Sequence, residues 1–194
     1  MTQFILGIDP GFGAMGMAVV DVRQRTWAVV HSRAVRTQRS TRKTTVRVAD
    51  DDAERARQLA AALHEVIREY RPMGAIVELP NGGARGARAA RALGIATGVV
   101  VAVLHVAGLP VEWVTPADVK SVAGTRNASK ADVQEAVRRL LSWPVGWPEE
   151  AWAQEHIADA AAAVLAAETG TLVRMVQRGT LLQTLERVMG GGTA

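Results

Sequence analysis

Short, uninterrupted runs of hydrophobic residues fill the first third of the chain, a pattern typical of buried β-strands. The runs cover residues 4–9, 15–21 and 26–32, and Pro10-Gly11-Phe12-Gly13 places turn-forming residues between the first two. Short turns join antiparallel strands, so we expect these three strands to form a meander. The basic, threonine-rich residues 33–48 show no clear period, and we expect a long loop or an extended hairpin there.

The hydrophobic period changes to about 3.6 residues from Asp50 onward, which indicates an amphipathic helix that ends at Pro72. Thr115-Pro116 and Ser129 are expected to open two further helices as N-caps. The other expected elements are a strand over 74–79, a helix over about 83–107, a strand over 111–114, and helices over about 129–141, 153–167 and 172–188.

The order of these elements, three strands followed by alternating helices and strands, predicts an α/β domain. Its sheet is expected to be mixed, antiparallel among the first three strands and parallel where a helix separates two strands. No segment repeats itself, so we expect one domain over residues 1–189 and a disordered, glycine-rich tail over residues 190–194.

One stretch imitates a membrane span, because residues 92–111 carry no formal charge and are long enough to cross a bilayer. His105 and Pro110 dilute its hydrophobicity, so we interpret it as a buried helix that packs closely at Gly94 and Gly98. A membrane span is the less favoured alternative. The N-terminal residues resemble a first strand rather than a signal peptide, and we expect a soluble, cytoplasmic protein.

Composition narrows the chemistry that this chain can perform. Its 194 residues include no cysteine, which excludes a disulfide scaffold, thiolate catalysis and any cysteine-ligated zinc or iron–sulfur site. The formal net charge is only +4, yet residues 22–49 hold eight Lys or Arg and not one acid. Such a cationic block favours a polyanionic partner, with an ordinary solvated surface as the alternative.

Two acids stand where hydrophobic residues are expected. Asp9 closes the first apolar strand and Glu78 nearly closes the fourth, although a buried carboxylate is costly unless it is paired or binds a cation. Further along, Glu155, His156 and Asp159 are spaced to share one helix face. Such ligands suit Mg²⁺ or Mn²⁺, and two of these ions can clamp the attacking and leaving oxygens in phosphodiester hydrolysis. The alternative, in which the first acid caps a turn and the second pairs with an arginine, stays open at this point.

Several short motifs follow one another over about residues 4–168. They are Ile5-Leu6-Gly7-Ile8-Asp9-Pro10-Gly11 with Gly16, Ala75-Ile76-Val77-Glu78, Ala92-Leu93-Gly94, Val114-Thr115-Pro116-Ala117-Asp118-Val119-Lys120, Ala128-Ser129-Lys130-Ala131-Asp132-Val133 and His156-Ile157-Ala158-Asp159-Ala160. Each motif alone is weak, but the ordered set resembles the RuvC family of Holliday-junction resolvases. The resemblance implies an RNase H-like fold, a homodimer, and metal-dependent cleavage of branched DNA.

The resemblance also implies roles for the acids. Asp9 matches the first-strand aspartate that bridges two metal ions, Glu78 matches the catalytic glutamate, and Asp159 matches the last acid on the C-terminal helix. His156 stands where many members have aspartate and some have histidine, and imidazole ligates Mn²⁺ better than Mg²⁺. The implied site therefore holds two Mg²⁺ or Mn²⁺ ions on these four side chains.

Basic residues are expected to hold the DNA. Lys120 and Lys130 match family lysines near the scissile phosphate, where positive charge offsets the charge that develops in the transition state. An ordinary solvated helix end is the alternative for both lysines. The residues expected to contact DNA phosphates are Arg36, Arg39, Arg42, Lys43, Arg85, Arg88 and Arg91.

Junction resolution by paired nicks is the favoured activity, but the chain departs from the family pattern at one point. Bacterial resolvases carry an aromatic wedge just after the catalytic glutamate, whereas Leu79-Pro80-Asn81-Gly82-Gly83-Ala84-Arg85 has none. A nuclease acting on flaps, forks or single strands is therefore an alternative. A non-catalytic branched-DNA-binding protein is another, as is an actin- or Hsp70-type nucleotide-binding fold, which normally needs a much longer chain.

Overall fold

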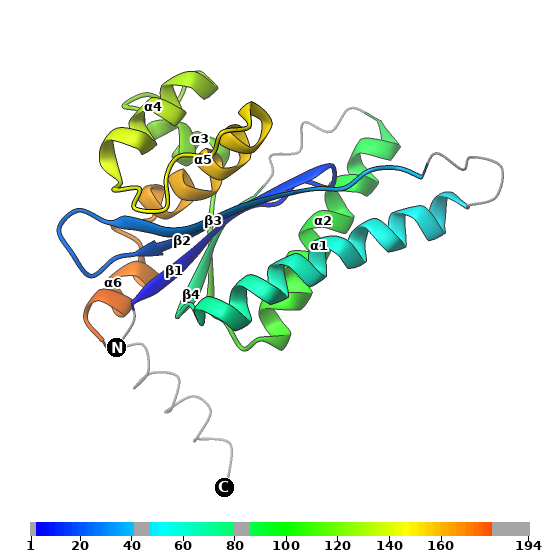
Figure 1. The fold of residues 1–194 in the computed structure, drawn as a ribbon, viewed down its shortest axis with the longest axis horizontal. Coiled ribbons are helices and arrows are strands. Elements are labelled where there is room, and N and C mark those ends of the chain that lie inside the picture. Colours follow the sequence, from blue (N-terminus) through cyan, green and yellow to red (C-terminus); the bar gives the residue numbers. More distant parts are fainter. Residues whose placement is uncertain (1–2, 41–46, 80–85, 180–194) are drawn as a thin grey trace, which may run out of the picture.

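A five-stranded sheet forms the centre of the molecule (Figure 1). The structure, a computed structural model, describes residues 3–40, 47–79 and 86–179 of the 194-residue chain. The strands lie in the order β3-β2-β1-β4-β5. Their bounds are β1 (Phe4–Asp9), β2 (Ala14–Asp21), β3 (Ala28–Arg36), β4 (Gly74–Glu78) and β5 (Val111–Val114).

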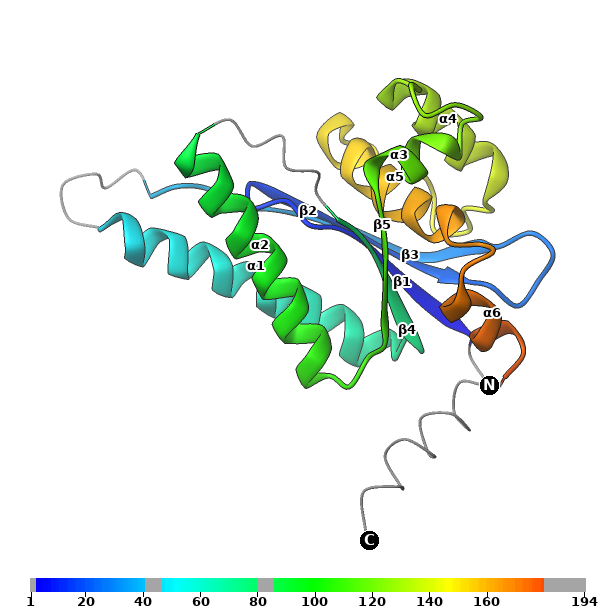
Figure 2. The same ribbon diagram turned by 180° about the vertical axis from the view of Figure 1, so that it is seen from behind.

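Helices cover both faces of this sheet, as the two opposite views in Figure 1 and Figure 2 show. On one face, α1 (Val48–Tyr70) and α2 (Ala87–Val106) lie side by side. On the other face, α5 (Ala151–Ala166) packs directly on β1 and β2. The helices α3 (Pro116–Ser121) and α4 (Lys130–Leu140) pack on α5, and α6 (Thr171–Gln177) follows it.

The strand pairing confirms the predicted mixed sheet. β1, β2 and β3 form the expected antiparallel meander, and β1, β4 and β5 run parallel. The predicted end of the third strand at residue 32 is wrong, because β3 continues to Arg36, which lies opposite Ala14 of β2. Residues 33–36 lack an apolar run, so their strand conformation comes from ladder hydrogen bonds to β2 rather than from burial.

The helix ends agree with the predicted caps in most places. Thr115 and Ser129 each accept a hydrogen bond from the third residue of the following helix, and each forms a complete capping box. α1 begins at Val48, two residues before the predicted start. α6 ends at Gln177, and the part of the expected 172–188 helix beyond residue 179 lies outside the described residues, as does the 190–194 tail.

The long apolar helix α2 is less buried than predicted. Ala96, Val100 and Leu104 pack inward, whereas Val101 is 47% and Val106 is 86% exposed. Apart from the backbone of α2 itself, no described atom lies within 4 Å of a Cβ built on Gly94 or Gly98, so the expected close packing is not made among the described residues. Of the described helices, α2 alone is long and apolar enough to cross a membrane, a property that one-sided core helices share.

Two glycines set the position of α5 on the sheet. A Cβ built on Gly7 would lie 2.0 Å from the carbonyl oxygen of Ala160, and one built on Gly16 would lie 2.0 Å from the carbonyl oxygen of His156. Only a residue without a side chain allows a helix backbone to come this close to a strand. The side chains of α5 are correspondingly small in this region, with fully buried alanines at 158 and 160–163.

Candidate active site

The site begins with two carboxylates on adjacent parallel strands. Asp9 is the last residue of β1 and Glu78 is the last residue of β4, and the register pairs Ile8 with Val77, one residue before each acid. Alternation along a strand sends neighbouring side chains to opposite faces. Ile8 lies in the core under α1 and α2, so Asp9 lies on the face that α5 covers.

α5 adds the remaining ligand-type groups. Its close contact with Gly16, which lies opposite Asp9 in the β1–β2 ladder, brings His156 over the end of β1. His156 Nδ1 lies 2.7 Å from Asp9 Oδ2, so a protonated ring nitrogen donates a hydrogen bond to the carboxylate. Asp159, one helical turn later, lines the same cavity. The sequence spacing alone predicted this shared helix face.

Two lysines close the rim of the cavity. Lys120 lies in the last turn of the short helix that Thr115 caps, and Lys130 is the first residue after the Ser129 cap. Lys130 Nζ forms an ion pair with a carboxylate oxygen of Glu155 on α5. The two capping boxes therefore fix the starts of the helices that carry these lysines. Glu155 holds the ammonium group of Lys130 toward α5.

The resulting cavity has a volume of about 330 Å³ and combines charged and apolar walls. Its charged residues come from two strands and three helices, which lie far apart in the sequence. They are Asp9, Glu78, Lys120, Lys130, Glu155, His156 and Asp159. Val119 and Val133 form part of the apolar wall and lower the local dielectric around these charges.

Burial and mutual repulsion raise the pKa values of two of the acids, Glu78 and Asp159. Burial, together with the negative charges of Asp9 and Asp159, raises the pKa of Glu78 to about 8. Burial, followed by repulsion from Asp9, raises the pKa of Asp159 to about 6. Lys120 and Lys130 act in the opposite direction on both carboxyl groups. A site with this much unfavourable negative charge gains strongly from a divalent cation.

The donor set fits Mg²⁺ or Mn²⁺, although the side chains are not closed around an ion. Carboxylate oxygens with one imidazole nitrogen are the ligands that these hard or borderline ions accept. Within residues 3–40, 47–79 and 86–179, no three acid or histidine side chains are close enough to hold a single ion together. The hydrogen bond between His156 and Asp9 joins Nδ1 to Oδ2, so an ion that used either of these two atoms would have to displace it.

The residues expected to bind DNA separate into distinct groups. Arg36 lies over the Trp152 ring on the α5 side, with its guanidinium carbon 5.7 Å from the ring centroid. Arg91 is held by Asp52 across α1 and α2 (Nη2 to Oδ2, 2.8 Å). Arg39 and Arg88 are exposed and line a second cavity on the α1–α2 face. The remaining three, Arg42, Lys43 and Arg85, lie outside the described residues.

Sequence reasoning missed one charged residue that the structure makes prominent. Arg55 is only 6% exposed, and its guanidinium lies over the Phe12 ring, 4.1 Å from guanidinium carbon to ring centroid. The signal was present, because Arg55 precedes Leu59 by four residues and so lies on the buried face of α1. A charged residue on the apolar face of a helix is as unusual as Asp9 and Glu78 are in their apolar strands, and it could have been noticed in the same way.

Comparison with known proteins gives a consistent result. The family model described as crossover junction endodeoxyribonuclease RuvC matches residues 5–167. The chain is 33% identical over 164 residues to a RuvC of Pelotomaculum thermopropionicum, covering 84% of this chain and 91% of that protein. It is also 33% identical over 141 residues to a RuvC of Shewanella amazonensis, covering 72% of this chain and 75% of the relative.

Solved structures show the same likeness. The structure of T. thermophilus RuvC in complex with a Holliday junction substrate superimposes with a TM-score of 0.69 at 28% identity, covering 92% of this chain and 97% of that one. The yeast mitochondrial Holliday junction resolvase superimposes with a TM-score of 0.61, covering 94% of this chain and 85% of that one. At 14% identity, the yeast enzyme shows the shared fold alone.

Proposed function

We propose, since this chain belongs to the RuvC family of crossover junction endodeoxyribonucleases, that its acidic cavity hydrolyses phosphodiester bonds in branched DNA and resolves four-way junctions by paired nicks. Its fold is RNase H-like. One observation carries the proposal: Asp9, Glu78 and Asp159 converge from two strands and a helix in a cavity that also contains two lysines.

Each group in the cavity has a task in this reaction. Asp9, Glu78, His156 and Asp159 would hold Mg²⁺ or Mn²⁺, with two ions in each site. Bound ions of this kind activate the attacking water and stabilise the leaving oxygen. The protein's own contribution is to hold the ligands on two strands and one helix whose separation the contacts at Gly7 and Gly16 set.

The lysines serve the phosphate rather than the ions. Lys120 and Lys130 lower the pKa values of both Glu78 and Asp159, so their positive charge acts within the cavity. A phosphate placed there gains the same attraction, which grows as negative charge develops in the transition state. Glu155 pairs with Lys130 and acts as its positioning residue until DNA competes for the ammonium group.

Paired nicks require two active sites, and each chain supplies one. A homodimer meets this need, and the outer face of α2 offers it a surface: Val101 and Val106 are exposed, and Gly94 leaves room for close approach of a second helix. A two-fold axis through such a self-complementary patch would place two equal sites in one particle. Acting on cellular DNA, the dimer would work in the cytoplasm.

The sequence supports a second candidate for the branched DNA substrate that this protein prefers. The segment after Glu78 contains no aromatic side chain to wedge between bases at a junction centre. Cleavage of flaps or forks uses the same phosphodiester chemistry and needs no such wedge. This second candidate predicts cutting at the branch of a flap while a four-way junction remains intact.

A cleavage panel tests both candidates. End-labelled four-way junction, flap, fork and linear duplex are incubated with Mg²⁺, with Mn²⁺ or with chelator. The wild type is compared with Asp9→Asn, which keeps the shape of the ligand but removes its charge. Asp50→Asn, an exposed acid on α1, is the matched control.

Paired nicks in the junction that vanish in chelator and in Asp9→Asn, and persist in Asp50→Asn, would support resolution. Cutting of flaps or forks while the junction stays intact would support the nuclease chemistry and show that the substrate is a flap or fork instead of a four-way junction. Metal-independent cutting, or no cutting of any substrate, would overturn the nuclease proposal and leave a protein that binds branched DNA without cleaving it.

A further inference from the structure

A second cavity lies on the opposite face of the sheet from the acidic site. It has a volume of about 620 Å³ and is lined by the β1–β2 turn and by the N-terminal parts of α1 and α2. Four arginines and one acid contribute its charges, which leaves it positive by three. They are Arg39, Arg55, Arg88, Arg91 and Asp52.

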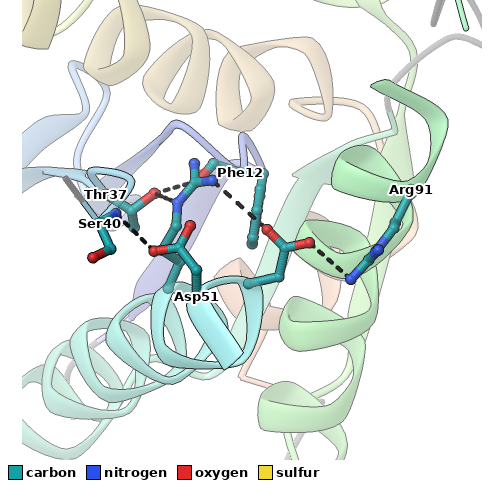
Figure 3. Close-up of polar contacts among 7 residues, drawn as sticks. Phe12, Thr37, Ser40, Asp51 and Arg91 are labelled. Carbon is teal, nitrogen blue, oxygen red and sulfur yellow. Dashed lines mark hydrogen bonds and ion pairs between the residues drawn. The ribbon is translucent and has the colours of Figure 1, made fainter. Parts of the chain in front are cut away.

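The floor of this cavity is a rigid network around the buried Arg55. Its Nε donates to Thr37 Oγ1 (3.0 Å), its Nη2 donates to the Phe12 carbonyl oxygen (3.3 Å), and its guanidinium covers the Phe12 ring. Figure 3 shows Phe12 and Thr37 joined through this network. Phe12 is only 7% exposed and Arg55 covers one face of its ring, so little aromatic surface is left there on which a base could stack.

The wall between the two helices is fixed as well. Asp52 of α1 contacts Arg55 (Oδ1 to Nη1, 3.9 Å) and binds Arg91 of α2 (Oδ2 to Nη2, 2.8 Å). Figure 3 shows Arg91 reaching from its helix to this carboxylate. One acid therefore holds two of the four arginines, and both serve to shape the cavity.

The other two arginines are available for a ligand. Arg39 follows the end of β3 and Arg88 is the second residue of α2, and both are exposed. Among the residues that the structure describes, none forms an ion pair or hydrogen bond with either side chain. Two guanidinium groups at the mouth of a positive cavity recognise phosphate groups, to which each can donate two parallel hydrogen bonds.

We propose that this cavity is a second DNA subsite, which binds backbone phosphates of a strand that passes from the acidic site around the end of the sheet. This inference rests on the proposed function. The turn that follows Asp9 leads directly to Phe12 in the cavity, and α2 begins shortly after Glu78, so the two sites adjoin the same end of β1 and β4. Contact is with phosphates and is independent of base sequence.

The test compares junction binding in chelator, where cleavage cannot interfere, for wild type, Arg39→Ala, Arg88→Ala and the double variant. Arg68→Ala, an exposed arginine at the far end of α1, is the charge-matched control. Each cavity variant should weaken binding roughly five- to tenfold near 0.1 M salt and reduce the slope of log K against log salt by about 0.9. Binding equal to that of the control would overturn the subsite.

A positional measurement separates a defined subsite from general attraction. Junctions carrying one neutral methylphosphonate at successive backbone positions are titrated against wild type and the double variant. A defined subsite predicts one or two positions, away from the scissile phosphate, whose neutralisation weakens wild-type binding and leaves the double variant unaffected. Equal sensitivity of both proteins at every position would overturn it.

Two further arms identify the source of the phosphate and keep the two proposals apart. Inorganic phosphate at constant ionic strength should compete with DNA no better than chloride. Specific competition by phosphate would show that the cavity binds a free anion instead of a DNA strand. If the wild type cuts no DNA while the positional pattern is present, the nuclease proposal fails and the subsite stands. If the wild type cleaves DNA normally but shows no positional pattern, the subsite proposal fails and the nuclease proposal stands.

Discussion

Among the described residues, Glu78 has the most strongly raised pKa. Burial and repulsion from Asp9 raise its pKa from 4.5 to about 8. Between these two pH values the folded protein keeps a proton that the unfolded chain has released, so raising the pH favours unfolding. The stability that Glu78 contributes is complete below about pH 4.5 and is lost as the pH rises through 8. Asp159 adds a smaller effect of the same sign, because its pKa is raised to about 6.

The metal-free protein should therefore lose thermal stability between pH 5.5 and 8.5. We expect its melting temperature to fall by roughly 3 °C or more across this range in chelator. Glu78→Gln should remove most of this decline and stabilise the metal-free protein at pH 8.5. Mg²⁺ should restore the wild type more than the variant at that pH, and Glu135→Gln, an exposed substitution on α4, is the control. A decline that is identical in wild type and Glu78→Gln would contradict the assignment.

Arg55 carries a prediction about stability rather than chemistry. Arg55→Leu keeps much of the side-chain volume but removes the guanidinium donor to Thr37 Oγ1 and one of the two donors to the Phe12 carbonyl oxygen, which keeps the Thr37 hydroxyl. It also leaves Asp52 without one of its two partners. We expect a loss of about 2–3 kcal/mol in the free energy of unfolding, measured by urea titration. Arg57→Leu removes an ion pair in which the arginine is 69% exposed, and it should change stability by less than about 1 kcal/mol.

At the residue scale, the chain revealed its acids more readily than its buried arginine. Asp9 and Glu78 interrupt apolar strands, so each was conspicuous in the sequence. Arg55 lies near the start of α1, where most residues are charged. Its burial therefore cannot be inferred until the buried face of the helix is known. The partner of Lys130 was equally hidden, because only the packing of α4 on α5 brings Glu155 to it.

Among the elements, α5 depends most on what lies beneath it. Gly16→Ala would place a methyl group 2.0 Å from the His156 carbonyl oxygen, so the helix or the strand must move. We expect a loss of about 1–3 kcal/mol in stability and at least roughly a hundredfold loss in cleavage, since displacement of catalytic groups by about 1 Å has that effect.

The measurements for Gly16→Ala are urea unfolding and single-turnover cleavage at saturating metal. Gly13→Ala is the stability control, because its new Cβ would meet no described atom within 4 Å. Its free energy of unfolding should change by less than about 1 kcal/mol. If Gly16→Ala cleaved at the wild-type rate, close contact with β2 would not be what positions His156.

The elements also show where sequence reasoning ends. Apolar runs and capping residues predicted β1, β4, β5 and the starts of α3 and α4 because those features act locally. The end of β3 depends on how far β2 offers a partner, and the exposure of α2 depends on what covers its outer face. The sequence of the segment alone therefore determines neither the end of β3 nor the exposure of α2.

For the whole molecule, the exposed face of α2 predicts the state of assembly. Val101→Lys with Val106→Lys should convert a dimer into a monomer, because two charges would replace two exposed valines of the proposed interface. Light scattering coupled to size exclusion measures the mass, and the junction assay should change from paired to single nicks. Val145→Lys, at a valine that is 50% exposed in a loop, is the control and should remain dimeric. A wild-type protein that is monomeric throughout would contradict the proposed interface.

The contact between α5 and the sheet has a consequence for how this protein can change under selection. When two side chains meet in a core, an enlarged one can be accommodated by a smaller residue opposite. At Gly7 and Gly16 the nearest opposing atoms are carbonyl oxygens of the helix backbone, which every residue possesses. A selection for second-site revertants should therefore recover suppressors of many core substitutions but, at these two glycines, return only the original residue.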